Sequence, residues 1–140
     1  MPIRLLVFER SSIMPTTLKQ VALVAGASRG AGRGIAYALG DVGMIVYVTG
    51  RSTNEQTTDN RSETIEETAA GVTARGGIGI PVVCDHTNQT DVDRLVQQIR
   101  SQYGRIDLLV NCVFGGSESH LPSGTGRRFW ERPPEHWDAM

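Results

Sequence analysis

Apolar stretches alternate with segments of helical periodicity along most of the chain. Where apolar residues recur at helical spacing and glycines stop the pattern, the sequence predicts helices. Strands that alternate with helices indicate right-handed crossovers and a parallel sheet, and near-continuous apolar strands fit burial on both faces. The predicted strands are Gln20–Ala25, Met44–Gly50, Ile78–Cys84 and Arg105–Val113, and the predicted helices are Gly30–Gly40, Ser62–Arg75 and a third that is capped by Asn88 or Thr90 and ends near Tyr103.

The other segments are expected to be loops or to lie outside the domain. Arg51–Arg61 is polar, and Phe114–Pro134 is rich in Gly, Ser, Pro and Arg, which is typical of loops. Pro133–Trp137 has the composition of a further helix start. Residues 1–17 are interpreted as an N-terminal extension without an assigned function, and residues 18–140 as a partial domain.

The composition is that of one globular domain. The 140 residues are 39% hydrophobic and 21% charged, which suits a packed core. The net charge of −1 gives no long-range attraction for nucleic acid or anionic lipid. No apolar run approaches the roughly 20 residues that a membrane span needs.

Three glycines stand between the first predicted strand and the first predicted helix. Gly26, Gly30 and Gly32 follow the spacing G-x-x-x-G-x-G. Glycine allows a tight turn and close approach of a phosphate, and a helix N-terminus offers free N–H groups and a partial positive charge. A Walker A loop does not fit, because Ala31 stands five residues after Gly26 and no Gly-Lys-Ser/Thr follows. The corner therefore predicts a dinucleotide-phosphate site.

The end of the second predicted strand distinguishes two cofactors. A NAD site usually carries an acid there for the ribose hydroxyls, whereas an Arg accommodates the extra phosphate of NADP. Here Arg51 and Ser52 follow Gly50, and no acid is present. Arg29 in the glycine loop adds a second guanidinium, a group that matches phosphate geometry. NADP is therefore favoured over NAD, while the interpretation of each arginine as a solvated loop cation stays open.

Several segments together resemble the short-chain dehydrogenase/reductase family. GASRGAG at Gly26–Gly32, CDHTN at Cys84–Asn88 and RIDLLVN at Arg105–Asn111 carry the resemblance. TIEETA, CVFGG and FWERPPEHWDAM are similar to its dehydrogenase/reductase member 1-like branch. The resemblance covers about residues 18–140. It implies the N-terminal half of a Rossmann-type, doubly wound parallel α/β fold with strand order 3-2-1-4, truncated before the catalytic residues.

The resemblance also implies which residues bind the cofactor. Asp85 would contact the adenine, while a capping role before the next helix stays open. Asn111 would hold the central strand beside the cofactor, while a purely structural role at the strand end stays open. The residues expected to line the pyrophosphate, the ribose and the NADP phosphate are Gly26, Ser28, Arg29, Gly30, Gly32, Arg51 and Ser52.

Four positions depart from the family pattern, and one of them is a cysteine. The family commonly has Thr and Ile where Ala25 and Ala31 stand, and Asn and Ala where Cys112 and Val113 stand. In the implied strand order, Cys84 and Cys112 end strands that lie roughly 14 Å apart. A disulfide needs Cα atoms within about 7 Å. We therefore expect two small buried thiols and a reducing, cytoplasmic setting.

The implied reaction is hydride transfer between NADPH and a carbonyl or alcohol substrate. The family's tyrosine acid/base, its lysine four residues later, and its serine and asparagine would all lie beyond Met140. Tyr47 has Arg51 four residues later, and a guanidinium does not replace an ammonium. Tyr37 and Tyr103 have aspartates at that spacing. We expect no catalytic residue within this chain and no activity of the chain alone.

Expected partners follow from the same observations. They are a small carbonyl or alcohol substrate of the full-length protein, with no nucleic acid, membrane or metal. His86, His120 and His136 lack metal-ligand spacing and are expected to be surface or loop residues. The fourth strand presents an apolar edge that favours self-association. A non-catalytic nucleotide-binding or interaction module stays open as an alternative, and Arg51 argues against a methyltransferase.

Overall fold

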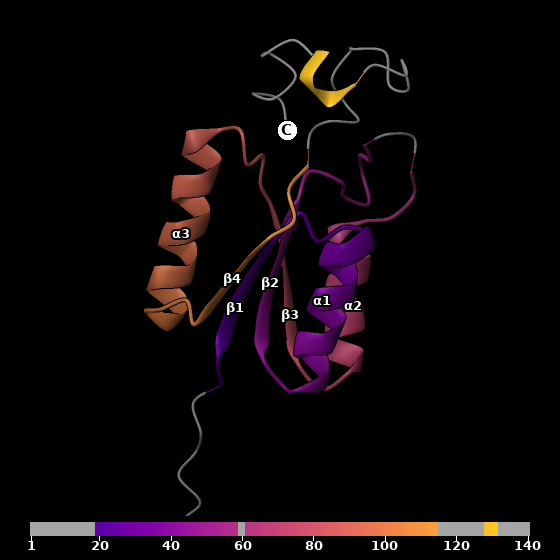
Figure 1. Cartoon of the computed structure of the whole chain (residues 1–140). Coiled ribbons are helices and arrows are strands. Elements are labelled where there is room, and N and C mark those ends of the chain that lie inside the picture. The colour runs from indigo at the N-terminus through magenta and orange to yellow at the C-terminus, as the bar shows by residue number, and fades with distance from the viewer. Residues whose placement is uncertain (1–18, 59–60, 115–127, 132–140) are drawn as a thin grey trace, which may run out of the picture.

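The described residues form one parallel sheet with helices on both faces (Figure 1). The computed structural model describes residues 19–58, 61–114 and 128–131. The strand order β3-β2-β1-β4 and the alternation of strands with helices confirm the expected Rossmann-type fold. The elements are β1 (Val21–Ala25), α1 (Gly30–Asp41), β2 (Ile45–Gly50), α2 (Ile65–Ala74), β3 (Ile78–Val83), α3 (Gln89–Tyr103), β4 (Leu108–Asn111) and the short 3-10 helix η1 (Phe129–Glu131).

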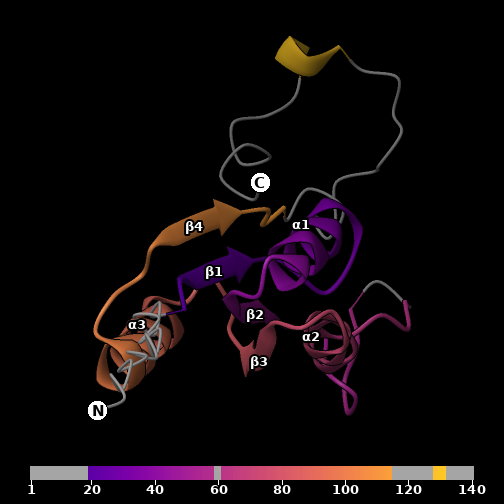
Figure 2. The same cartoon turned by 90° about the horizontal axis from the view of Figure 1, so that it is seen from below.

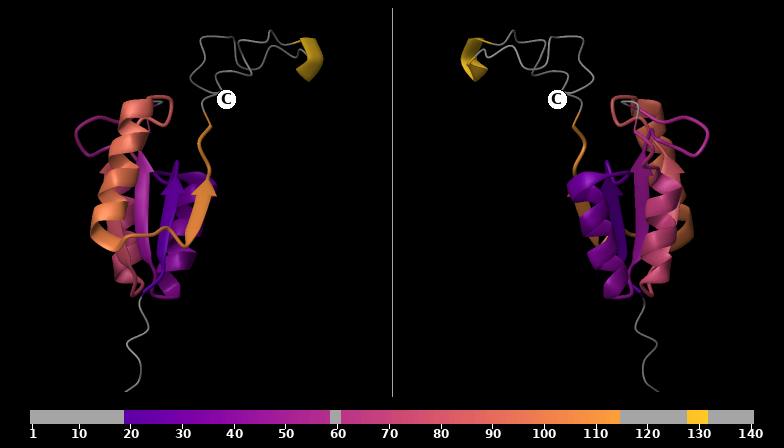
Figure 3. Two further views of the ribbon diagram at one scale, coloured as in Figure 1. Left: turned by 90° about the vertical axis from the view of Figure 1, so that its left-hand side faces the viewer. Right: turned by 90° about the vertical axis from the view of Figure 1, so that its right-hand side faces the viewer.

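The long helices cover opposite faces of the sheet. α1 and α2 pack on one face and α3 on the other (Figures 1 and 2), and Figure 3 shows each helical layer from its own side. Successive side chains of a strand point to opposite faces. Ala22 and Val24 of β1 therefore lie in the core under α1 and α2, whereas Val21 and Leu23 lie in the core under α3. Two hydrophobic cores hold the central strands between them.

Burial falls sharply from the centre of the sheet to its margins. All residues of β1 and β2 are buried, whereas those of β3 and β4 are exposed or half-buried. Val83 of β3 is 57% exposed and Leu109 of β4 is 63% exposed. The expectation of burial on both faces is therefore wrong for β3 and β4. Among the described residues, each of these strands has a neighbouring strand on one side alone.

A capping side chain sets the start of α2. The Thr64 hydroxyl accepts a hydrogen bond from the Glu67 N–H at 3.1 Å, so Thr64 is the N-cap and the helix begins at Ile65. The predicted start at Ser62 is therefore too early. Acidic residues do stand in the first turn, as expected, because they interact favourably with the helix dipole.

The bounds of α3 and β4 also follow from specific side chains. Asn88 caps α3 by accepting the Thr90 N–H at 2.9 Å, which decides between the two predicted caps. β4 is shorter than predicted. Before it, the Asp107 carboxylate accepts the Val21 N–H at 2.7 Å, so a side chain takes the place of a strand hydrogen bond. The other bounds agree with the prediction to about one residue.

Some predicted features fall on residues that the structure does not describe. They are the N-terminal extension at 1–17, the helix start at Pro133–Trp137 and most of the loop Phe114–Pro134. Among the described residues, no helix has the length and apolar character to cross a membrane. In the same part of the chain, no group of His, Cys, Asp and Glu side chains is arranged to hold a metal ion.

Candidate functional site

The corner between β1 and α1 depends on Gly26. Its φ is +75°, and a Cβ there would lie 2.7 Å from the carbonyl oxygen of Cys112. The N–H groups of Gly26 and Ala27 both donate to the Thr49 carbonyl at 3.0 Å, which ties the corner to β2. A Cβ on Gly32 would collide with the Gly26 carbonyl. Two of the three predicted glycines are therefore required by the fold of the corner itself.

The N-terminus of α1 has room and donors for an anion. Its N-cap, Arg29, is extended and makes no side-chain capping hydrogen bond within the described residues, and no acid stands in the first turn. α2 and α3 have capping side chains, Thr64 and Asn88, and acids in their first turns. Gly30 has a φ of +58°, and, apart from its chain neighbours and its own helix backbone, no heavy atom of the described residues lies within 4 Å of its Cβ position. The first-turn N–H groups and the helix dipole of α1 thus fit a pyrophosphate.

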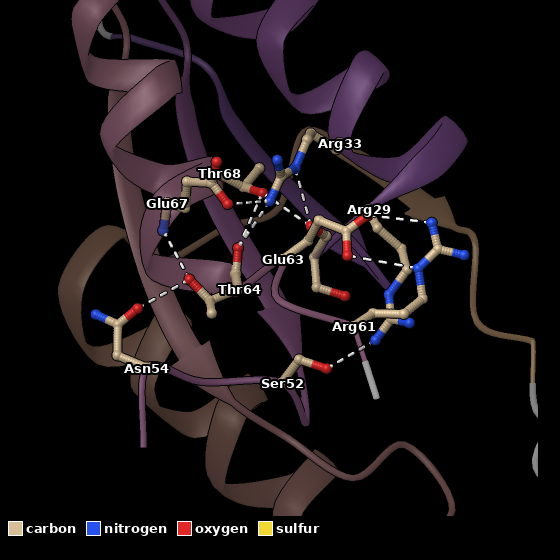
Figure 4. A network of polar contacts seen from close by, with 10 residues as sticks. Arg29, Arg33, Ser52, Asn54, Arg61, Glu63, Thr64, Glu67 and Thr68 are labelled. Atoms are coloured by element: carbon tan, nitrogen blue, oxygen red, sulfur yellow. Dashed lines mark hydrogen bonds and ion pairs between the residues drawn. The ribbon is translucent and has the colours of Figure 1, made fainter. Parts of the chain in front are cut away.

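Side chains of α1 and α2 hold the carbonyl of Ser28. The Arg33 Nε donates to this oxygen at 2.9 Å, and the Thr68 hydroxyl donates to it at 3.4 Å. Arg33 also forms an ion pair with Glu67 at 2.8 Å (Figure 4), and the hydrogen bond from Arg33 lowers the pKa of the Glu67 carboxyl. Ser28 itself is buried. The loop carbonyl therefore faces α2, and the sequence did not reveal the contacts of Thr68 and Glu67 because these residues lie far along the chain from Ser28 and Arg33.

Arg29 reaches the carboxyl end of β2. Its Nη2 donates to the Ser52 hydroxyl at 2.9 Å and to the Thr58 hydroxyl at 2.7 Å. Ser52 is almost completely buried. The structure thus brings together two predicted site residues, Arg29 and Ser52, and adds Thr58, which sequence reasoning missed. No acid stands in the segment Gly50–Thr53 that ends β2.

Arg51 and Asp85 lie within electrostatic reach of each other. The pKa of the Asp85 carboxyl is lowered chiefly by hydrogen bonds from Thr87, and the positive charge of Arg51 contributes. Asp85 Oδ1 accepts the Thr87 hydroxyl at 2.7 Å and the Thr87 N–H at 2.9 Å. One carboxylate oxygen of Asp85 is thus used within the turn before α3, whose N-cap is Asn88. Contact of Asp85 with adenine stays a prediction.

His86 lies in the turn between β3 and α3, where a surface or loop histidine was expected. Its side chain is half-buried, and its Nε2 lies 3.0 Å from the Thr49 hydroxyl. Burial lowers the pKa of its imidazole, so the neutral form is favoured. The expected loop position is therefore confirmed for His86, and its ring is less exposed than that of a surface histidine because it lies against Thr49 of β2. His120 and His136 lie outside the described residues.

Asn111 ends β4 beside the corner. It pairs in register with Ala25, and its Oδ1 accepts the Val113 N–H at 3.1 Å. This is the structural role that the sequence left open, and a cofactor role stays a prediction. Both cysteines are free, as expected, but Cys112 is only half-buried while Cys84 is fully buried. The expectation of two buried thiols is thus wrong for Cys112, because β4 lies at the sheet margin.

Tyr47 is the tyrosine whose side chain the structure buries completely. The one lysine in the sequence, Lys19, precedes all three tyrosines. Tyr47 donates its hydroxyl to Gln102, and burial raises its pKa to about 12. An acid/base tyrosine needs a lowered pKa, so Tyr47 is unsuited to that role at neutral pH.

Comparison with known proteins places these features in a family. The sequence model of the protein family described as short chain dehydrogenase matches residues 20–132 of this chain. Dehydrogenase/reductase SDR family member 1 of Mus musculus is 42% identical over 122 residues, which are 86% of this chain and 36% of that protein. The Homo sapiens protein of the same name is 40% identical over the same shares. The chain thus spans 36% of the length of these curated relatives.

Solved structures agree with this assignment. A metagenomic short-chain oxidoreductase in complex with NADP is 29% identical, with a TM-score of 0.64, over 86% of this chain and 48% of its own. A short-chain dehydrogenase/reductase from Burkholderia xenovorans is 34% identical, with a TM-score of 0.55, over 66% of this chain and 34% of its own. The glycine corner, the strand order and the matched sequence model lead to one conclusion: this chain belongs to the short-chain dehydrogenase/reductase family.

Proposed function

We propose that this chain binds NADP at the corner between β1, α1 and β2. The observation that carries the proposal is the end of β2, where Arg51 and Ser52 stand without an acid and the Arg29 guanidinium reaches the Ser52 hydroxyl at 2.9 Å. Guanidinium groups bind phosphate as charged, forked donors. NAD carries no phosphate at this position, so it would gain nothing from them. The relative that was solved with NADP supports the same choice.

In this proposal, different residues hold different parts of the cofactor. The first-turn N–H groups of α1 bind the pyrophosphate, and Gly30 leaves space for its close approach. Arg29 and Arg51, with the Ser52 hydroxyl, bind the phosphate on the ribose. Asp85 and Asn111 lie at the adenine side and at the end of β4, as the family resemblance implies. The bound cofactor would supply or accept the hydride.

The reaction of the full-length protein is also a proposal. We infer hydride transfer between NADPH and a carbonyl or alcohol substrate, because the chain belongs to a family of such oxidoreductases. A cytoplasmic setting is proposed because a reducing compartment suits the two free cysteines. We further infer that the 140-residue chain binds the cofactor without turnover. This inference is supported by the position of Lys19 before every tyrosine and by the raised pKa of Tyr47.

The variant Arg51→Ala tests the cofactor choice. We expect the Kd for NADPH to rise about tenfold or more, because a charged hydrogen bond contributes roughly 1.5–3 kcal/mol. The Kd for NADH should hardly change, because NADH lacks the extra phosphate. Isothermal titration calorimetry of both cofactors measures this difference.

A matched control separates this effect from a general loss of positive charge. Arg94→Ala removes an arginine that is 69% exposed on α3 and pairs with Asp91. It should leave both affinities unchanged. Equal losses for NADPH and NADH in Arg51→Ala would contradict the proposal, and binding of neither cofactor by the parent chain would overturn it.

One observation favours a second candidate, an interaction module. β4 is a margin of the sheet in the described structure, and its Leu109 is 63% exposed. An apolar strand edge is a template for pairing with another chain. We propose a second copy of this chain as the partner, which would exist alongside cofactor binding.

A further inference from the structure

Thr58 occupies an unexpected place beside the proposed phosphate site. A turn in which the Thr53 N–H donates to the Gln56 carbonyl at 2.7 Å folds the segment after β2 back on itself. Thr58 then contacts Ser52 twice: its N–H donates to the Ser52 hydroxyl at 3.2 Å, and the two hydroxyl oxygens lie 2.7 Å apart. The Ser52 carbonyl accepts the Ile65 N–H at 3.0 Å, which fixes this arrangement to the start of α2.

Both hydroxyl groups accept hydrogen bonds from Arg29. The Nη2 group donates to Ser52 Oγ at 2.9 Å and to Thr58 Oγ1 at 2.7 Å. The three side chains therefore form a compact cluster of one guanidinium and two hydroxyls, which we call the Arg29–Ser52–Thr58 cluster. Nearby, Arg61 pairs with Glu63 at 3.1 Å, so the Glu63 carboxylate has a cation of its own.

The hydrogen atoms of the cluster can be counted. A hydroxyl oxygen has one proton to donate and two lone pairs to accept with. Ser52 Oγ accepts from Arg29 and from the Thr58 N–H, so both lone pairs are used and its own proton goes to Thr58 Oγ1. Thr58 Oγ1 then accepts from Ser52 and from Arg29. Within the described residues the Thr58 proton is left over, since neither Arg29 nor Ser52 has a lone pair free to accept it.

The position of that proton suits an incoming anion. Ser52 is almost fully buried, whereas Thr58 is half-buried and reaches the surface. A phosphate oxygen offers the acceptor that the cluster lacks, and the Arg29 charge beside it favours a negative group. An oxygen of a neutral ribose hydroxyl would gain much less from the same position.

We propose that Thr58 is a specificity-determining residue that donates its hydroxyl proton to the 2′-phosphate of NADP. This inference rests on the proposed cofactor function and adds to it a contact outside the glycine corner and outside the residues that directly end β2. It makes the segment after β2 part of the cofactor site. Its chemical target is a phosphate monoester on the adenosine ribose.

The test compares ligands with and without that phosphate. Titration calorimetry of the full chain with adenosine 2′,5′-bisphosphate and with adenosine 5′-monophosphate measures the two affinities. Thr58→Val should raise the Kd for the bisphosphate by roughly tenfold and leave the Kd for the monophosphate unchanged. Thr58→Ser, which keeps the hydroxyl, should restore the affinity. Thr57→Val is the matched control, because Thr57 is exposed and adjacent, and it should behave as the parent chain.

A double variant distinguishes direct contact from support of Arg29. In a chain that already carries Arg29→Ala, Thr58→Val should still raise the Kd for the bisphosphate several-fold. No further loss in that background would mean that Thr58 only holds the guanidinium, and it would overturn the inference. Equal affinity of the parent chain and Thr58→Val would overturn it as well. Failure of the parent chain to bind either ligand or NADPH would instead overturn the proposed function, and this inference with it.

Discussion

Gly26 is the residue at which the corner tolerates least change. Its φ of +75° disfavours any residue with a Cβ, and that Cβ would lie 2.7 Å from the backbone oxygen of Cys112. Gly26→Ala combines both costs, so we expect the free energy of unfolding to fall by about 2 kcal/mol or more. Urea denaturation followed by circular dichroism measures the change.

A second glycine provides the control for this prediction. Gly34 lies in α1 without a positive φ, and outside its own helix backbone no heavy atom in the described part of the chain lies within 4 Å of its Cβ position. Gly34→Ala should therefore stabilise the chain by about 0.5–1 kcal/mol, because alanine favours a helix. Similar effects of the two substitutions would contradict the account of the corner.

Local chemistry decides which residues the sequence could reveal. The need for glycine at the corner is a property of a few adjacent residues, so the spacing from Gly26 to Gly32 was sufficient to predict it. The roles of Thr58 and His86 depend on partners that the fold brings from elsewhere, Arg29 and Thr49. Their residue types alone carry no signal of those contacts, so the sequence predicted a polar loop around Thr58 and a surface or loop histidine at His86, without either partner.

Helices and strands, too, were predicted well where the signal is local and less well where it depends on contacts. β1, α1 and β2 were predicted to about one residue, because buried strands show long apolar runs and glycines interrupt them. The start of α2 was missed because Ser62 and Thr64 are both good caps, and only the hydrogen bond to Glu67 decides between them. β4 was predicted too long because apolar residues continue beyond the pairing with β1.

Tyr47 joins β2 to α3, and this link predicts a loss of stability in alkali. Its hydroxyl donates to Gln102 of α3, and its ring meets Tyr103 edge-on at 6.1 Å. Burial raises its pKa from 10.0 to about 12. The folded state thus holds the Tyr47 proton more tightly than the unfolded state does. The contribution of this hydroxyl to the free energy of unfolding is therefore complete below pH 10 and is lost as the pH rises towards 12.

The variant Tyr47→Phe isolates this contribution. At pH 8 it should be less stable than the parent chain by about 1 kcal/mol, because the hydrogen bond to Gln102 is lost. At pH 11 the difference should shrink, since the parent alone must keep Tyr47 protonated in order to fold. Urea midpoints at both pH values measure it, and a difference independent of pH would contradict the assignment.

For the molecule as a whole, the two margins of the sheet are chemically unlike. β3 contains Pro81, which has no N–H to offer to an additional strand, and proline is a known protection of edge strands. β4 contains no proline and exposes Leu109. Although Val83 of β3 is exposed to a similar degree, we expect another chain to add at β4 and not at β3.

Sedimentation velocity over a range of concentrations tests this asymmetry. The parent chain should form larger species as its concentration rises, through pairing at β4. Leu109→Lys places a charge on that margin and should keep the chain monomeric, whereas Val83→Lys on the opposite margin should associate as the parent does. Suppression of association by both substitutions would point to general hydrophobic aggregation. A parent chain that stays monomeric at every concentration would remove the interaction-module alternative and leave cofactor binding as the function that the structure supports.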